Sequence, residues 1–317
     1  MDRSGHPHDT GHVDGAGHPR DAPHLSGSLE VLTAAFPVLV QDLGRPGLAS
    51  VGVSESGAAD RGSYLLGARL LGQHDDRDRP PAALEITNGS VSLRVSGSPT
   101  LVLTGARAEA TLDEVPVPHA TPFHVRHGQH VRLATPSVGL RTYLSVRGGI
   151  DAAPVLGSRA TDTLSGLGPA PLIAGARVRT ARPAGWWLPG IDVPAPDPPA
   201  TDPLALDVLP GPRADWVTDS LAGTVWTVSQ DANRVGVRTH GTPLRRAGDR
   251  VGQELASEGI VRGAIQVPPE GTPVVFLADH PVTGGYPVVG VLTERSADLA
   301  AQARPGQRLR FRAAAVR

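Results

Sequence analysis

This 317-residue chain contains neither cysteine nor lysine, so all 30 of its basic residues are arginine. The absence of cysteine excludes disulfides, thiolate metal ligands and a cysteine nucleophile. The absence of lysine excludes a covalently attached biotin, a Schiff base, a carboxylated lysine and a Walker-type phosphate loop, because each of these needs an amine. If ATP or biotin takes part in the function, another chain therefore carries the lysine-dependent step.

Long apolar runs and a strong charge imbalance are also missing. No run is long enough to cross a bilayer and no signal-like apolar segment follows Met1, so we expect a cytoplasmic location. The formal net charge of -1 gives no indication of nucleic-acid or membrane binding. A hydrophobic fraction of 39% over this length suffices for two domains with ordinary cores.

The composition divides the chain into four parts. Residues 1–27 are rich in Gly, Pro, Asp and His and predict a disordered tail. Residues 28–182 are expected to form an N-terminal β domain, residues 183–203 a proline-rich linker and residues 204–317 a C-terminal β domain.

Short alternating apolar segments, punctuated by Gly, Pro and Asp, fill both predicted domains. This pattern predicts a mainly β fold with few helices and two β-barrel-like domains, the first of them a barrel or a sandwich. One clear helix is predicted over residues 61–71, with Asp60 in the N-cap position, and shorter helices near 214–221 and 298–302.

A strand-turn-strand unit near the C-terminus carries most of the candidate chemistry. Apolar runs at 264–267 and 274–278 flank a Pro-Pro-Glu-Gly turn, which predicts a hairpin. Glu258 and Asp279 flank it and are the candidate general acid and base, because two carboxylates at one site commonly acquire different pKa values. Tyr286 is a candidate hydrogen-bond donor to a developing oxyanion.

Paired glycines follow this hairpin, and they allow backbone N–H groups to approach a ligand closely. The alternative is that the glycines only assist a strand connection. The candidate binding residues of this segment are Gln266, Thr283, Gly284 and Gly285.

Gln41, Asp42 and Arg45 surround a glycine directly after an apolar strand, where barrels place binding groups. Arg45 could pair bidentately with a substrate carboxylate. Alternatively, Asp42 and Arg45 could satisfy each other and the backbone of the turn.

Two short segments with turn-forming residues are further candidates. Ser56 and Gly57 could form an anion-accepting turn that leads into a helix N-terminus, while Asp60 alone could be a simple cap. Asn233 and Arg234 lie at the tip of a turn between strands, and Asn there tolerates the left-handed conformation.

Two arginines complete the candidate set. Arg147 leaves a strand through two glycines and Arg159 follows in a loop, so either would suit a carboxylate or carboxyphosphate ligand, although a structural pair between Arg159 and Asp151 would need none. Four histidines between residues 119 and 130 are dispersed by strand alternation, so we expect no zinc site.

Several ordered sequence blocks carry a family resemblance. They are QDLGRPG at 41–47, SGAAD at 56–60, ALE at 83–85, YLSVRGGID at 143–151, LGSRAT at 156–161, NRVG at 233–236, SEGI at 257–260, GAIQVP at 263–268, TGGYP at 283–287 and AQARPG at 301–306. With these blocks the sequence resembles the family of the bacterial 5-oxoprolinase C subunit, also known as KipA or allophanate hydrolase subunit 2. This family is related to the carboxyltransferase part of urea carboxylase, and the likeness covers residues 30–315.

The resemblance implies a cyclophilin-like β-barrel in the C-terminal domain. It also implies a hydrolase subunit, inactive alone, that joins two partners to open the lactam of 5-oxoproline to glutamate. These partners are the KipI-like B subunit of 5-oxoprolinase, together with its A subunit. The complex would use ATP, and no covalent biotin would sit on this chain. Two alternatives remain: the carboxyltransferase component of a urea-carboxylase-like biotin system, or a non-catalytic KipA-type protein that binds a KipI-like kinase inhibitor.

The chain departs from the family pattern at three places. Ala59 stands where the family usually has Met, and Ala160 where it has Ser; both are expected to be packing changes. The third departure, His-Pro-Val at 280–282, touches the candidate site, so it bears on which substrate the site accepts.

Overall fold

The computed structural model describes residues 1, 27–73, 80–183 and 201–314. Most of the predicted tail and linker therefore lies outside the described residues. The described chain is mainly β and contains two α-helices, α1 (Arg61–Leu70) and α2 (Glu294–Ala301). This confirms the predicted fold class, and neither helix has the length and apolar character that crossing a membrane requires.

The N-terminal part of the described chain is a sandwich of two sheets. One sheet has the order β11 (Ile150–Asp151), β12 (Arg177–Thr180), β1 (Ser28–Ala34), β4 (Val91–Ser96), β9 (His130–Leu133), β6 (Ala110–Leu112) and β7 (Val115–Pro116). The other has the order β2 (Leu39–Gln41), β3 (Ala83–Thr87), β10 (Arg141–Val146), β5 (Thr100–Gly105) and β8 (Phe123–His124). Alternate residues of both sheets, such as Leu93, Val95, Leu84 and Leu144, form one buried core between them.

Helix α1 covers the outer face of the second sheet, so β10 is buried on both sides and all six of its residues are inaccessible. The helix begins as predicted, because the Asp60 side chain accepts a hydrogen bond from Ser63 N–H at 2.9 Å. Gly67 permits the close approach: a Cβ there would lie 2.4 Å from the Ser145 hydroxyl of β10.

The C-terminal part closes into a barrel. Its strands follow the order β13 (Leu204–Pro210), β20 (Val288–Leu292), β17 (Ala264–Gln266), β18 (Val274–Phe276), β15 (Gly236–His240), β14 (Val225–Val228) and β21 (Arg308–Ala313). The predicted hairpin is the antiparallel pair β17 and β18. A short ribbon of β16 (Glu258–Gly259) and β19 (Thr283–Gly284) lies beside the barrel.

Two of the shorter helix predictions need correction. Residues 214–221 do not form one helix but two single-turn 3₁₀ helices, Ala214–Trp216 and Leu221–Gly223, because Val217 is extended and bridges to Arg246. The last helix begins earlier than predicted, at Glu294, where the Thr293 hydroxyl caps it.

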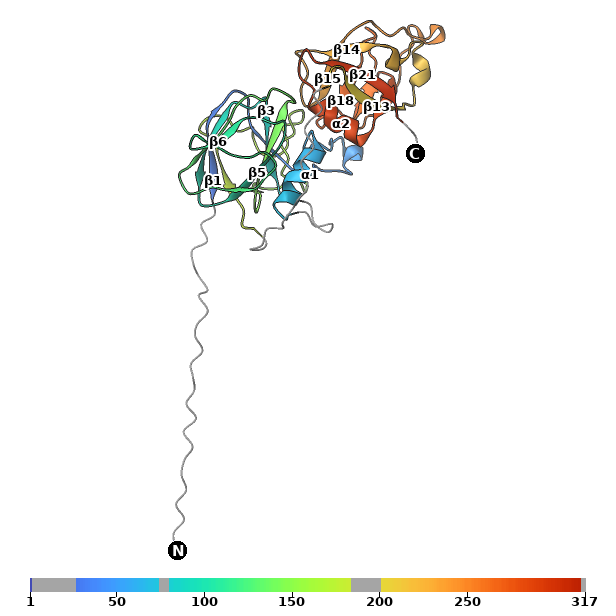
Figure 1. Cartoon of the computed structure of the whole chain (residues 1–317). Coiled ribbons are helices and arrows are strands. Elements are labelled where there is room, and N and C mark those ends of the chain that lie inside the picture. The colour runs from blue at the N-terminus through green and yellow to red at the C-terminus, as the bar shows by residue number, and fades with distance from the viewer. Residues whose placement is uncertain (2–26, 74–79, 184–200, 315–317) are drawn as a thin grey trace.

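The two parts meet where α1 and α2 pack against each other, between the sandwich and the barrel (Figure 1). The Asp298 carboxylate of α2 accepts hydrogen bonds from Arg61 N–H at 2.9 Å and Gly62 N–H at 3.1 Å, at the start of α1. Gln302 donates to Asp60 at 2.7 Å and accepts from Arg141 N–H at 2.8 Å. This contact fixes the candidate residues of one part against those of the other.

Candidate functional site

Glu85 is a fully buried carboxylate inside an otherwise apolar strand. In β3, its neighbours Leu84 and Ile86 face the sandwich core, so alternation turns Glu85 to the opposite face. There it accepts hydrogen bonds from Ala59 N–H at 3.0 Å and from the Tyr143 hydroxyl at 2.7 Å. A buried carboxylate needs positive partners as well. Arg141 of the neighbouring strand β10 forms an ion pair with Glu85 at 3.5 Å, and the barrel supplies a second partner.

Arg234, from the turn before β15, is that partner. Its guanidinium forms an ion pair with Glu85, donates to the Gly57 carbonyl at 2.6 Å and reaches both oxygens of Asp279 at 2.9 Å each. Burial by itself would raise the pKa of both carboxyls, but the Arg234 charge holds the pKa of Glu85 and of Asp279 below their ordinary values. The three side chains form a permanently ionised link between the two parts.

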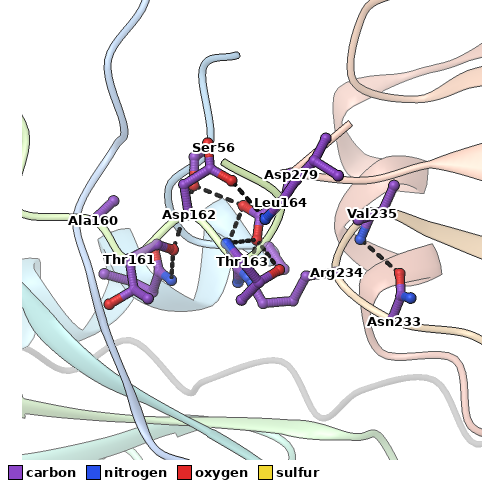
Figure 2. A network of polar contacts seen from close by, with 12 residues as sticks. Ser56, Ala160, Thr161, Asp162, Thr163, Leu164, Asn233, Arg234, Val235 and Asp279 are labelled. Atoms are coloured by element: carbon purple, nitrogen blue, oxygen red, sulfur yellow. Dashed lines mark hydrogen bonds and ion pairs between the residues drawn. The ribbon is translucent and has the colours of Figure 1, made fainter. Parts of the chain in front are cut away.

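Asp279 is also bound by two hydroxyl groups from the N-terminal part (Figure 2). Ser56 Oγ donates to it at 2.6 Å, and Thr163 donates from Oγ1 at 2.6 Å and from N–H at 2.9 Å. Ser56 has a φ of 54°, in the left-handed region, and Gly57 follows with a φ of 91°. The anion that the predicted Ser56–Gly57 turn meets in this structure is thus the chain's own Asp279.

The side chains of Gln41 and Asp42 hold the loop at 158–161. Gln41 Nε2 donates to the Thr161 carbonyl at 2.8 Å. Asp42 accepts from the Ser158 hydroxyl at 2.6 Å and from Arg159 N–H at 2.7 Å. Asp42 also accepts from Gly44 N–H at 2.7 Å, so the alternative is right about the turn backbone and wrong about a pair between Asp42 and Arg45.

Arg45 is a buried cation without a counter-ion. Only 1% of the residue is exposed. Nη2 donates to the Ala160 carbonyl at 2.6 Å and Nε donates to the Val155 carbonyl at 3.4 Å. Nη1 is buried without a hydrogen-bond partner, and within the described ranges no carboxylate forms an ion pair with this guanidinium. An anionic ligand would supply both the missing hydrogen-bond acceptor and the missing negative charge for this guanidinium.

Arg45 lines a cavity of about 200 Å³ between the loop at 45–55, the β16–β19 ribbon and the segment after β18. The cavity wall also contains the polar side chains of Glu55, Arg262 and His280. Ile260 and Val282 supply apolar surface. Glu55 forms an ion pair with Arg61 at 2.9 Å, and Arg262 forms ion pairs with Glu294 and Asp298. Arg45 is thus the wall cation whose charge the described protein does not neutralise.

One end of the ribbon reaches this cavity, whereas the glycine pair is not among its wall residues. Ile260 N–H donates to the Val282 carbonyl at 2.9 Å, so the ribbon ends in the cavity wall. Glu258 pairs with Gly284 in the ribbon. Gln266 of β17 donates to the Tyr286 carbonyl at 2.9 Å and thereby holds the chain that follows Thr283, Gly284 and Gly285.

The structure does not join the two candidate acid–base carboxylates. Glu258 is partly exposed and paired with Arg213, whose hydrogen bond lowers the pKa of this carboxyl. Asp279 is sealed and bound to Arg234. Tyr286 is 45% exposed, so this residue is open to solvent. The sharing of proton work by Glu258 and Asp279 stays a prediction, and accessibility favours Glu258.

The remaining candidates lie apart from the cavity walls. Asp151 pairs with Arg179 at 2.8 Å, so the structural pair with Arg159 does not form. Arg147 follows β10, and its backbone N–H bonds to the neighbouring strand β5. Asn233 accepts two backbone hydrogen bonds within its own turn, from the N–H groups of residues 235 and 236, as the turn interpretation predicts. Its φ is not positive, so the turn does not use the left-handed conformation that Asn tolerates.

Sequence reasoning missed four participants in this region: Glu85, Tyr143, Thr163 and Arg262. One signal was present for the first of them, because a glutamate within the apolar run ALEIT of a central strand must find a buried partner. Nothing local marks the other three, whose partners lie far away along the chain.

Comparisons with known proteins bear on this geometry. Residues 51–313 match the model of a protein family that is described as the carboxyltransferase domain, subdomain A and B. The chain is 34% identical over 292 residues to the C subunit of 5-oxoprolinase from Escherichia coli, covering 89% of this chain and 90% of that protein.

Two crystal structures share the fold. That of TTHA0988 superposes with a TM-score of 0.80 at 30% sequence identity, covering 92% of this chain and 57% of that one. That of the K. lactis urea amidolyase gives a TM-score of 0.79 at 27% identity, covering 92% of this chain and 19% of that one. This chain therefore spans little more than half of the first protein and a fifth of the second.

Proposed function

Because this chain belongs to the family of the carboxyltransferase domain, subdomain A and B, we propose that it is one component of an ATP-dependent 5-oxoprolinase. The reaction adds water across the lactam of 5-oxoproline: the C–N bond breaks, the carbonyl carbon takes the hydroxide and the ring nitrogen takes a proton, which gives glutamate. ATP hydrolysis drives the opening. The chain acts only with its partners, which are the KipI-like B subunit of the complex, together with the A subunit.

The buried guanidinium of Arg45 is the observation that carries the proposal. Its Nη1 is buried without a partner, and Arg45 is among the residues that line a cavity of about 200 Å³, a size suited to a small ligand. 5-Oxoproline is a small carboxylate, and a carboxylate on Arg45 would complete both the hydrogen bonds and the charge of this site.

The other candidate residues take roles according to their accessibility. Glu258 is our candidate for proton transfer, since it is partly exposed and lies in the ribbon whose end lines the cavity. The backbone around Gly284 and Gly285, with the Tyr286 hydroxyl, is our candidate for stabilising negative charge on the opening lactam. Asp279 holds Ser56, Thr163 and Arg234 in place. The lysine-dependent part of ATP binding falls to a partner, because this chain has no lysine.

The experiment is to co-express the chain with its genomic neighbours and to measure ATP-dependent glutamate formation from 5-oxoproline. The proposal expects turnover from the full set and none when this chain is omitted. Turnover that persists without this chain would contradict it.

A second function has an observation in its favour. The matching family model is that of a carboxyltransferase domain, and the fold is shared with a urea amidolyase. The alternative is a carboxyltransferase component that works with biotin on another chain. Biotin-dependent carboxylation of urea by the same co-expressed set, without glutamate formation, would select this alternative.

A further inference from the structure

His280 is a buried imidazole in the wall of the same cavity, next in sequence to Asp279. Its Nδ1 lies 2.8 Å from the Pro281 carbonyl oxygen. A carbonyl oxygen can only accept a hydrogen bond, so Nδ1 must carry the proton. In the neutral ring the proton is then absent from Nε2, which is left with a free lone pair.

Nε2 has access to the cavity. No residue of the described chain bonds to it, and it is not among the polar atoms that the protein seals from solvent without a partner. His280 and Arg45 line one cavity of about 200 Å³. The cavity wall thus combines a fixed hydrogen-bond acceptor at His280 with the uncompensated positive charge of Arg45, whose Nη1 is itself buried without a partner.

We infer that this cavity binds a small carboxylate that also carries an N–H donor near the carboxylate, with the anion on Arg45 and the N–H on His280 Nε2. The inference rests on the proposed function, since 5-oxoproline has its lactam N–H on the carbon that bears the carboxylate. His280 would select a lactam over a ring of the same shape that lacks the N–H, because an acceptor left without a donor in a closed site weakens binding.

Burial favours the neutral form of the His280 ring at pH 7, against the hydrogen bond to the Pro281 carbonyl and the nearby carboxylates. Burial lowers the pKa of His280 below its ordinary value; the nearby Glu55 and Asp279 carboxylates oppose this shift and Arg61 supports it. Arg45 also lines this cavity and adds positive charge. The acceptor form of Nε2 is therefore the populated one at neutral pH, and it disappears when acid protonates the ring.

The test compares two ligands by calorimetric titration of the full-length chain. One ligand is 5-oxoproline, and the other is 3-oxocyclopentane-1-carboxylate, in which a CH₂ group replaces the ring N–H. Wild-type protein should bind 5-oxoproline roughly three- to tenfold more tightly at pH 7. His280→Phe, which keeps a ring but no acceptor, should bind both ligands equally, whereas His280→Gln, which keeps an acceptor, should retain part of the preference.

A second measurement uses only the wild-type protein, so its result does not depend on whether the variants fold. In the wild-type protein the preference for 5-oxoproline should vanish as the pH falls below the pKa of His280, because the protonated ring cannot accept a hydrogen bond. A preference that persists in acid or in a folded His280→Phe variant would overturn the inference and leave the proposed function intact.

The outcomes also separate the inference from the function on which it rests. If the reconstituted complex forms glutamate but this chain alone binds neither ligand, the inference fails and the function stands. If the complex does not turn over 5-oxoproline, the proposed function fails. Preferential binding of 5-oxoproline to the chain would then still support the site as a receptor for this class of ligand.

Discussion

Arg234 binds Asp279 through two parallel hydrogen bonds of 2.9 Å, and its remaining Nη1 forms an ion pair with Glu85 of the N-terminal sandwich. Arg234 of the barrel therefore bridges two carboxylates that are both 0% exposed, and Arg141 of the sandwich forms a second ion pair with Glu85 at 3.5 Å. Such a link is costly to break from one side, because a buried charge is then left without its partner.

Replacing this arginine should destabilise the protein strongly. Arg234→Met leaves Asp279 without its cation and Glu85 with Arg141 alone, and we expect the free energy of unfolding to fall by about 3–5 kcal/mol in urea titrations. Arg245→Met is the matched control, because Arg245 is 79% exposed and pairs with Asp219 at the surface, where little change is expected. Equal effects of the two substitutions would contradict the account.

The sequence predicts features that local patterns control. The hairpin of β17 and β18, the helix after Asp60 and the mainly β fold class follow from apolar runs, turn residues and a capping side chain. Arg45, chosen from a polar strand end, proves to be the unpaired cation of the cavity.

Long-range pairings could not be predicted in the same way. Arg234 and Glu85 are separated by 149 positions, and only folding reveals that they meet. The expected pairs of Asp42 with Arg45 and of Asp151 with Arg159 fail for the same reason, because Asp42 binds Ser158 and Arg159 binds the Ala152 carbonyl instead.

Substitutions of Ser56 test how much its hydroxyl, which binds Asp279, contributes to the stability of the protein. Ser56→Ala removes a 2.6 Å hydrogen bond to a buried carboxylate and keeps the left-handed backbone, so we expect a loss of roughly 1.5–3 kcal/mol. Ser56→Gly loses the same bond but tolerates the φ of 54°, so it should be more stable than Ser56→Ala by roughly 1 kcal/mol. Urea unfolding of both variants checks this order, and the reverse order would show that the backbone stores no strain there.

Asp60 should make the folded state less stable as the pH rises through mild acid. Burial, followed by the nearby Asp298 carboxylate, raises the pKa of Asp60 from 3.8 to about 6. Between these values the folded state holds more protons than the unfolded state, so stability falls with increasing pH, in total by on the order of 3 kcal/mol. Asp60→Asn keeps a capping oxygen but cannot ionise. Unfolding titrations from pH 4 to pH 7 should show the fall only in the wild-type protein, and parallel curves would contradict this assignment.

The two candidate carboxylates should respond differently to neutralisation. Glu258→Gln removes a partly exposed carboxylate, so folding should be little changed while glutamate formation by the complex falls roughly a hundredfold or more. Asp279→Asn removes the anion that Arg234, Ser56 and Thr163 bind. The melting temperature of this variant should therefore fall, and it is the property to measure first, ahead of activity. Full activity in a folded Glu258→Gln variant would remove Glu258 from the mechanism.

The most direct test of the central claim, that Arg45 holds the substrate carboxylate, is kcat/KM of the reconstituted complex for 5-oxoproline with Arg45→Leu. The account predicts a fall of about ten- to a hundredfold in a protein that melts normally, with partial rescue by Arg45→Lys, which restores a positive charge. Arg177→Leu is the control, because Arg177 is 61% exposed and pairs with Glu30 at the sandwich surface. An unchanged kcat/KM in folded Arg45→Leu would contradict the assignment of the cavity as the substrate site.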